Sequence, residues 1–156
     1  MGILTENVIN VFKQASSAFW IAACDTEGKP LVVRVSGVEL RDDDTVCSYV
    51  PMKFGSELQS KLVSGLPVSL LAASTINFES YQLKGNCVSI DNATSDATTR
   101  QMNNLQAFAD CTAVLGLSAE LCYRAYADEH FLAIEVKLHS VFDQSPKNNA
   151  GLKLNC

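Results

Sequence analysis

Apolar residues recur at helical spacing near the start of the chain. Between residues 5 and 17 they fall on one side of a helix, and Thr5 is a residue type that can cap its first turn. The apolar positions are Val8, Ile9, Phe12 and Ala15. This spacing predicts a helix over residues 5–17.

Beyond this segment the pattern changes to short apolar runs with polar stretches between them. The runs cover residues 19–24, 31–40 and 45–50. Residues 25–30 contain Asp, Gly and Pro, and residues 41–44 contain three aspartates; all of these residue types favour turns. Pro51 ends the third run, because proline lacks the N–H that a strand ladder needs. Two hairpins in succession predict an antiparallel meander of three strands.

The second half of the chain alternates helical and strand-like patterns. Helical spacing returns over residues 53–64 and 96–113, and a second short helix is predicted over 117–126. Strand patterns cover residues 67–73, 78–90 and 131–142, and the long middle one can bend at Gly85. Six strands with few helices predict a mainly β protein with peripheral α-helices, built as a small barrel that hides its sheet edges.

Composition narrows the class of protein. The chain has 156 residues, 47% of them hydrophobic and 19% charged, and no repeat or linker divides it, so we expect a single domain over residues 1–156. Its net charge of −5 and the lack of a basic cluster argue against nucleic acid as a partner. The longest apolar run, around residues 66–73, is too short to cross a membrane. No secretory signal pattern precedes the first helix, and we expect a cytoplasmic protein.

The six cysteines show no Cys-x-x-Cys pair, and their spacing suits neither a zinc site nor a tight disulfide framework. We expect Cys24, Cys47 and Cys87 to be buried, because they lie in apolar strand-like segments. Cys156 is the cysteine expected to be exposed. The single tryptophan, Trp20, is expected in the core rather than under a ligand.

Three groups of residues resemble a known family. Gly28-Lys29-Pro30 is followed by Arg34 in the next strand and Tyr49 in the third, the segment 80–85 ends in a glycine before a bend, and 141–146 resembles a closing segment. Together they resemble the split-barrel flavoproteins related to pyridoxamine 5′-phosphate oxidase. The resemblance implies a six-stranded antiparallel split β-barrel with helices at the barrel ends. It also implies FMN in a groove between two barrels, and therefore a homodimer.

The resemblance also assigns cofactor contacts. Arg34, with Val35 beside it, stands where the family contacts the cofactor phosphate, and a guanidinium suits that anion. Tyr49 and Val50 match residues that pass beside the flavin. Ordinary strand packing, and for Arg34 a position on the solvent face, are the alternatives for these residues.

Two further candidates lie on one face of the strand that ends at Gly85. Gln82 has an amide that can donate to and accept from the pyrimidine edge of a flavin at once. Alignment on Gly85 instead places Ser80 at the position of the family's flavin-contacting glutamine. Since the two residues are two apart on a strand, both are candidates.

The sequence departs from the family where the helix after the third strand begins. Pyridoxamine 5′-phosphate oxidase carries a Ser-Arg-Lys run there, and this chain has Ser56-Glu57-Leu58. An FMN phosphate would then depend on Arg34, Lys53, Ser56 and the backbone amides of that helix, with Glu57 opposing it. The missing cations argue against true pyridoxamine-phosphate oxidase activity.

Two functions fit these observations. One is an FMN-dependent oxidoreductase acting on a small molecule that the sequence does not specify; because the flavin would supply the chemistry, no acid–base pair or nucleophile is needed. The other is a non-catalytic binding or regulatory dimer that has lost flavin or takes another planar ligand, such as haem. His130 and His139 lack the spacing of a metal site, and no glycine-rich phosphate loop is present.

Overall fold

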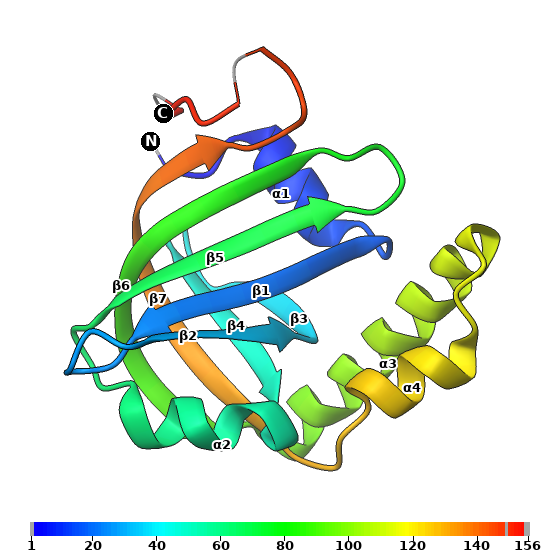
Figure 1. Cartoon of the computed structure of the whole chain (residues 1–156), viewed down its shortest axis with the longest axis horizontal. Coiled ribbons are helices and arrows are strands. Elements are labelled where there is room, and N and C mark those ends of the chain that lie inside the picture. Colours follow the sequence, from blue (N-terminus) through cyan, green and yellow to red (C-terminus); the bar gives the residue numbers. More distant parts are fainter. Residues whose placement is uncertain (1, 149, 155–156) are drawn as a thin grey trace.

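The computed structural model describes residues 2–148 and 150–154 and contains one curled antiparallel sheet with helices around it (Figure 1). In these residues the sheet has seven strands in the order β2-β1-β5-β6-β7-β4-β3. Their bounds are β1 Ser17–Cys24, β2 Pro30–Val35, β3 Gly37–Leu40, β4 Thr45–Pro51, β5 Pro67–Ser74, β6 Ser80–Asn92 and β7 Phe131–Asp143. The helices are α1 Glu6–Lys13, α2 Met52–Lys61, α3 Ser95–Thr112 and α4 Ala119–Tyr126, with a 3₁₀ turn η1 Ala113–Leu115 after α3. The predicted mainly β architecture with peripheral helices is confirmed.

The expected strand over residues 31–40 is divided at Ser36, so the prediction of six strands is wrong by one. Its first half, β2, pairs with β1, whereas its second half, β3, pairs with β4 at the other edge of the sheet. The backbone N–H of Ser36 donates to the carbonyl of Tyr49 (2.8 Å) at the point of change. One stretch of chain therefore belongs to both edges of the sheet, and the bend at Ser36 is what lets it change neighbours.

Strand alternation puts apolar side chains into the barrel and leaves the opposite face outside. Each strand contributes to this core, and among its fully buried side chains are Ile21, Leu70, Leu83 and Ile134. The bend expected at Gly85 is confirmed by a shift of register between Lys84 and Gly85 where β6 pairs with β7. A Cβ at Gly85 would meet the carbonyl oxygen of Lys137, so only glycine fits where the two strands approach so closely.

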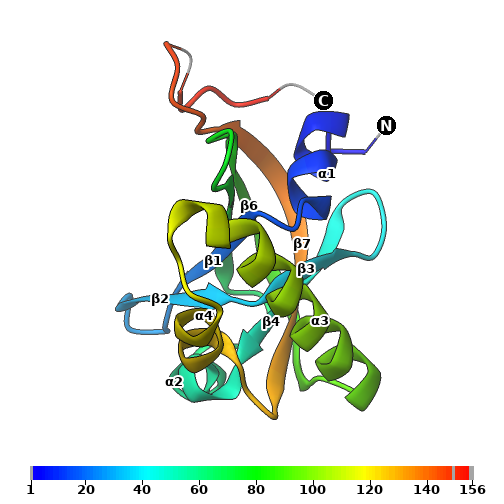
Figure 2. The ribbon, with the colours of Figure 1, turned by 90° about the vertical axis from the view of Figure 1, so that its right-hand side faces the viewer.

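The α3–α4 hairpin lies across the end of the sheet near β2 and β3, with α1 above it (Figure 2). The outer face of β4 is covered by α3, where Cys47, Tyr49 and Phe131 pack against Ala97. Gly37 lies under the same helix, and a Cβ there would meet the amide of the buried Gln101. The close seat of α3 on this edge therefore depends on a glycine at the start of β3.

Cys47 and Cys87 are buried, as expected, but Cys24 is exposed because it ends β1 on the outward-facing side. Cys156 lies outside the described residues. The cysteines that the structure describes are free thiols. Among the helices of the described segments, none is both long enough and apolar enough to span a membrane.

Candidate functional site

A hollow of about 690 Å³ lies on the outer face of the sheet. We call it the outer-face hollow; its lining is Trp20, Ala22, Val32, Ser69, Leu71, Ala73, Ser80, Gln82 and Gln144. Most of these residues occupy outward-facing positions of β2, β1, β5 and β6. Trp20, Leu71 and Gln82 stand directly opposite one another across three neighbouring strands. The hollow therefore has an apolar floor that includes the indole of Trp20, amides along one side and no charged residue in its lining.

Gln82 is held in a short chain of hydrogen bonds. Its Nε2 donates to the hydroxyl of Ser69 (2.9 Å), and its Oε1 accepts from the Nε2 of Gln144 (3.2 Å). A primary amide has two donor hydrogens and two acceptor positions, so Gln82 keeps one of each for a ligand. Ser80 is tied through its backbone to Gln144 and Ser145 (2.8 and 3.1 Å) at the edge of the same hollow. The two candidates on β6 thus lie together, and their surroundings fix them.

Arg34 lies one strand beyond Trp20, directly opposite it in the β1–β2 pair. Its guanidinium carbon is surrounded by three aromatic rings, at 4.6 Å from the centroid of Trp20, 4.8 Å from Tyr126 and 5.3 Å from Phe108. In the part of the chain that the structure describes, no carboxylate pairs with this guanidinium and no oxygen accepts a hydrogen bond from it. Burial lowers the pKa of Arg34 below its ordinary value. The guanidinium of Arg34 is therefore enclosed by aromatic rings, and its N–H groups have no acceptor among the described residues.

Arg34 does not line the outer-face hollow but a second cavity of about 260 Å³, which we call the Arg34 cavity. It lies where α1 ends, between the β2–β3 bend and α3. Its polar lining residues besides Arg34 include Lys13, Gln14, Ser36 and Asn104, and its aromatic ones are Phe12, Phe19, Phe108 and Tyr126. Its lining includes no carboxylate, so both of its charges are positive.

The first turn of α2, where the sequence suggested further phosphate contacts, is already paired within the protein. The ammonium of Lys53 donates to the carbonyls of Arg124 (3.2 Å) and Ala127 (2.9 Å) at the end of α4. The backbone N–H of Lys53 donates to the carboxylate of Asp128 (2.9 Å), which also accepts from the N–H of His130 (3.2 Å). An aspartate thus stands at the N-terminus of α2, where an anion would otherwise bind.

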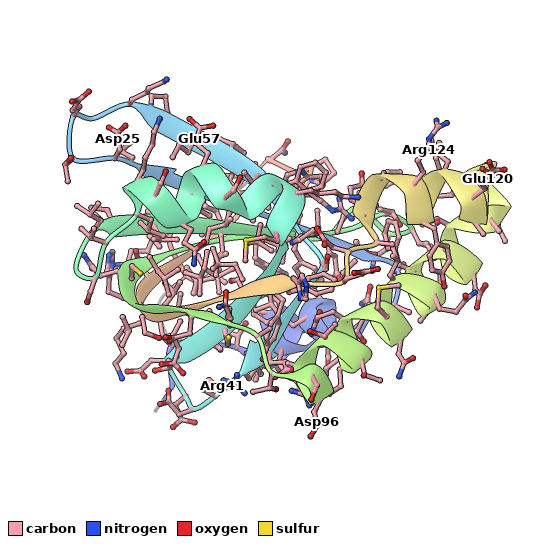
Figure 3. All side chains as sticks on the ribbon, turned by 90° about the horizontal axis from the view of Figure 1, so that it is seen from below. Asp25, Arg41, Glu57, Asp96, Glu120 and Arg124 are labelled. Atoms are coloured by element: carbon pink, nitrogen blue, oxygen red, sulfur yellow. The ribbon has the colours of Figure 1, made fainter. Side chains whose placement is uncertain are left out.

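Ser56 is exposed on the next part of α2. Glu57 pairs with Lys61 (2.7 Å), whose ammonium also lies 3.9 Å from Asp25. Figure 3 shows Glu57 and Asp25 on the same side of the molecule, between α2 and the β1–β2 turn. Glu57, which we expected to repel an FMN phosphate, therefore forms a surface ion pair with Lys61.

Tyr49, Val35 and Val50 have places in the folded core. Val35 and Val50 point into the barrel, although Val35 also reaches the wall of the Arg34 cavity. The hydroxyl of Tyr49 donates to Glu39 (2.9 Å) and accepts from Arg41 (2.8 Å) under α3. Burial and the hydrogen bond to Glu39 raise the pKa of Tyr49 to about 12. Tyr49 and Val50 line neither the hollow nor the cavity.

The predicted contacts therefore separate into groups. Ser80 and Gln82 share the outer-face hollow, Arg34 lies in its own cavity, and Lys53 and Ser56 lie on α2. Trp20, expected in the core, is half-buried and forms the floor of the hollow. The sequence contained a signal for this position of Trp20, because a hairpin that turns at residues 25–29 pairs Trp20 with Arg34.

Lys13 and Asn104 had no such signal in the sequence, since they reach the Arg34 cavity only through the packing of α1 and α3. Within the described ranges, no three His, Cys, Asp or Glu side chains gather as a metal site would need. The chemistry available at the two hollows is therefore apolar contact, amide hydrogen bonding and positive charge.

No protein-family model matches the sequence, and no curated protein matches it. Solved structures do. A candidate pyridoxamine 5′-phosphate oxidase from Lactobacillus delbrueckii is 17% identical, with a TM-score of 0.55 over 91% of this chain and 95% of that one. HupZ from Group A Streptococcus is 13% identical, with a TM-score of 0.52 over 95% and 99%. An F420 reductase is 10% identical, with a TM-score of 0.51 over 88% and 98%. The chain therefore has the split-barrel fold of pyridoxamine 5′-phosphate oxidase-like proteins.

Proposed function

We propose that this protein is a homodimeric flavin-binding protein of the oxidoreductase type, with the flavin ring in the outer-face hollow. The observation that carries the proposal is the row Trp20, Leu71, Gln82 across β1, β5 and β6. It offers a flat apolar floor to one face of a ring and an amide with a free donor and a free acceptor to the edge of that ring. When bound, the flavin supplies hydride or electron transfer, and the chain supplies position and surroundings.

The similar structures support a redox ligand. One is described as a candidate pyridoxamine 5′-phosphate oxidase and another as an F420 reductase. Their shared fold supports a planar redox ligand for this chain. The absence of free cations at the start of α2 argues that the substrate of this chain is not pyridoxamine phosphate.

The phosphate of FMN is the weaker part of the fit. The lining of the hollow contains no charged side chain, and the nearest arginine, Arg34, lies behind the Trp20 ring in another cavity. Flavin binding as proposed therefore rests on the ring. The contact between Arg34 and an FMN phosphate, which the family resemblance implies, is not needed by this proposal and stays a separate prediction; unchanged FMN affinity of Arg34→Ala would remove Arg34 from the flavin site.

We expect the two copies of the homodimer to meet through this same outer face of the sheet. Val32 is 65% exposed, and it lies beside Trp20, Ala22, Leu71 and Ala73 on one open surface. A ring lying in so shallow a hollow needs cover on its other face, and a second copy of the same apolar surface provides it by two-fold symmetry. We expect Val32→Asp to give monomers in light scattering and to lose the ligand together with the dimer.

The test is the visible spectrum of the purified protein, before and after addition of FMN. We expect the visible absorbance of a bound flavin to remain with the protein on desalting. Gln82→Leu removes both hydrogen-bonding groups at nearly constant volume and should weaken flavin binding about tenfold. Gln59→Leu on the exposed side of α2 is the matched control, and it should bind like the wild type.

Colourless protein that takes up no FMN would refute the proposal. A haem spectrum in place of the flavin spectrum would assign the hollow to another planar ligand and make the chain a binding protein. Equal affinity of Gln82→Leu and Gln59→Leu for FMN would remove the flavin ring from the hollow.

A further inference from the structure

The Arg34 cavity holds positive charge that the protein itself does not neutralise. A cation taken out of water is normally paired with a carboxylate or fully hydrogen-bonded, because an unpaired buried charge destabilises the fold. Arg34 has aromatic rings on three sides instead, and its guanidinium N–H groups have no acceptor among the described residues. The faces of the rings stabilise the charge, but they leave the in-plane donors unused.

Three further residues of this cavity carry a positive charge or hydrogen-bond donors. Lys13, at the last turn of α1, adds a second positive charge that has no ion pair among the described residues, and Asn104 on α3 adds an amide. Ser36 lines the cavity at the β2–β3 bend, and its buried hydroxyl has no hydrogen-bond partner among the residues described. Residues from α1, β2, the β2–β3 bend and α3 thus present charge or donors to one space, and none of its lining residues is acidic.

The cavity is separate from the outer-face hollow. The two linings have no residue in common, and the Trp20 ring that floors the hollow lies between it and the guanidinium of Arg34. At about 260 Å³ the Arg34 cavity is also smaller than the sites that hold ligands of drug size. It suits a small anion with a short organic part, and its rings suit an apolar or planar body.

We propose that the Arg34 cavity is a second ligand site, which binds a small phosphate monoester through Arg34, Lys13, Ser36 and Asn104. A phosphate monoester carries close to two negative charges at neutral pH and three acceptor oxygens, which matches two cations and two neutral donor groups. The planar fork of a guanidinium meets two of those oxygens at once. The rings of Phe108 and Tyr126 keep the fork in one orientation. This site does not depend on flavin in the hollow.

Trp20 provides the readout, because it is the only tryptophan of the chain and it stacks on Arg34. We expect inorganic phosphate, titrated into the full-length protein, to change the tryptophan fluorescence to saturation, with the same affinity in calorimetry. Lys13→Gln, an exposed change that the fold tolerates, should weaken phosphate binding about fivefold, and Arg34→Gln at least about thirtyfold. Lys29→Gln in the β1–β2 turn is the matched control and should leave the affinity unchanged.

Absence of saturable phosphate binding in both measurements would overturn the proposal, as would equal affinities of Lys13→Gln and Lys29→Gln. A competition experiment separates this site from the flavin site. Phosphate that binds equally well in the presence of FMN supports a second site. Phosphate that displaces FMN but not riboflavin would overturn it, because the cavity would then hold the phosphate of the flavin. Phosphate binding without any flavin binding supports this inference while refuting the proposed function.

Discussion

The first turn of α2 and the Arg34 cavity both place positive charge near one end of the sheet, and the protein treats the two charges differently. At α2, the ammonium of Lys53 is bound to the carbonyls that end α4, and Asp128 covers the backbone amides. At the cavity, Arg34 has rings around it and no acceptor in the described residues. A charge that the fold already satisfies contributes to stability, whereas a charge that the fold leaves unsatisfied points to a ligand.

The variant expected to have the largest effect is Asp128→Ala, at the first turn of α2, where the protein already pairs its own charge. The alanine removes the acceptor of the Lys53 and His130 N–H groups and leaves the first turn of α2 uncapped. We expect the free energy of unfolding to fall by about 1–2 kcal/mol, measured by urea denaturation, with phosphate affinity unchanged.

Asp128→Asn is the control for that variant, since it keeps an oxygen for the cap and should lose less than half as much. Acid adds a second check. Although burial opposes it, the N–H groups around Asp128 hold the pKa of its carboxyl below the ordinary value. Its contribution is therefore present above the unfolded pKa and is lost as the pH falls through the folded one. A wild-type protein as stable at pH 2 as at pH 6, relative to Asp128→Ala, would contradict this role.

These two regions also show which parts of the fold and of the site could be predicted from the sequence. Alternation predicted each strand but not the break at Ser36, because a pattern of apolar positions does not say which neighbour each half of a strand joins. Arg34 and Trp20 belong to one hairpin, so their pairing follows from local order. Lys53 finds its acceptors 71 and 74 residues later, and no local rule forecasts that a predicted phosphate ligand will cap another helix instead.

Tyr49 is expected to have an intermediate effect. It is a predicted flavin contact whose hydroxyl is already hydrogen-bonded within the protein. Its hydroxyl lies between Glu39 and Arg41. Tyr49→Phe should cost about 1 kcal/mol at neutral pH, because the carboxylate and the guanidinium remain paired with each other at 3.1 Å. Ligand affinity should not change.

The pH dependence of Tyr49 gives that variant its signature. The folded pKa is raised to about 12 from an ordinary 10.0, so the contribution of the phenol is complete below pH 10 and is lost as the pH rises toward 12. Wild-type stability should therefore fall across this interval more steeply than that of Tyr49→Phe, as followed by chemical denaturation in alkaline buffers. Parallel curves for the two proteins would show that the hydroxyl is not held as described.

Arg34→Met is expected to have the smallest effect on stability and bears most directly on the contrast. Methionine fills similar space among the rings of Trp20, Phe108 and Tyr126 without a charge. Ring contacts of roughly 0.5–1 kcal/mol each are lost, but so is the desolvation of a guanidinium that no carboxylate offsets. We therefore expect the free energy of unfolding to change by less than about 0.5 kcal/mol, while phosphate binding disappears. Arg124→Met, at a side chain that points away from α4 into solvent (Figure 3), is the control with neither effect. A loss of more than about 2 kcal/mol would instead make Arg34 a structural clamp between the barrel and the α3–α4 hairpin, satisfied by its rings as Lys53 is by its carbonyls.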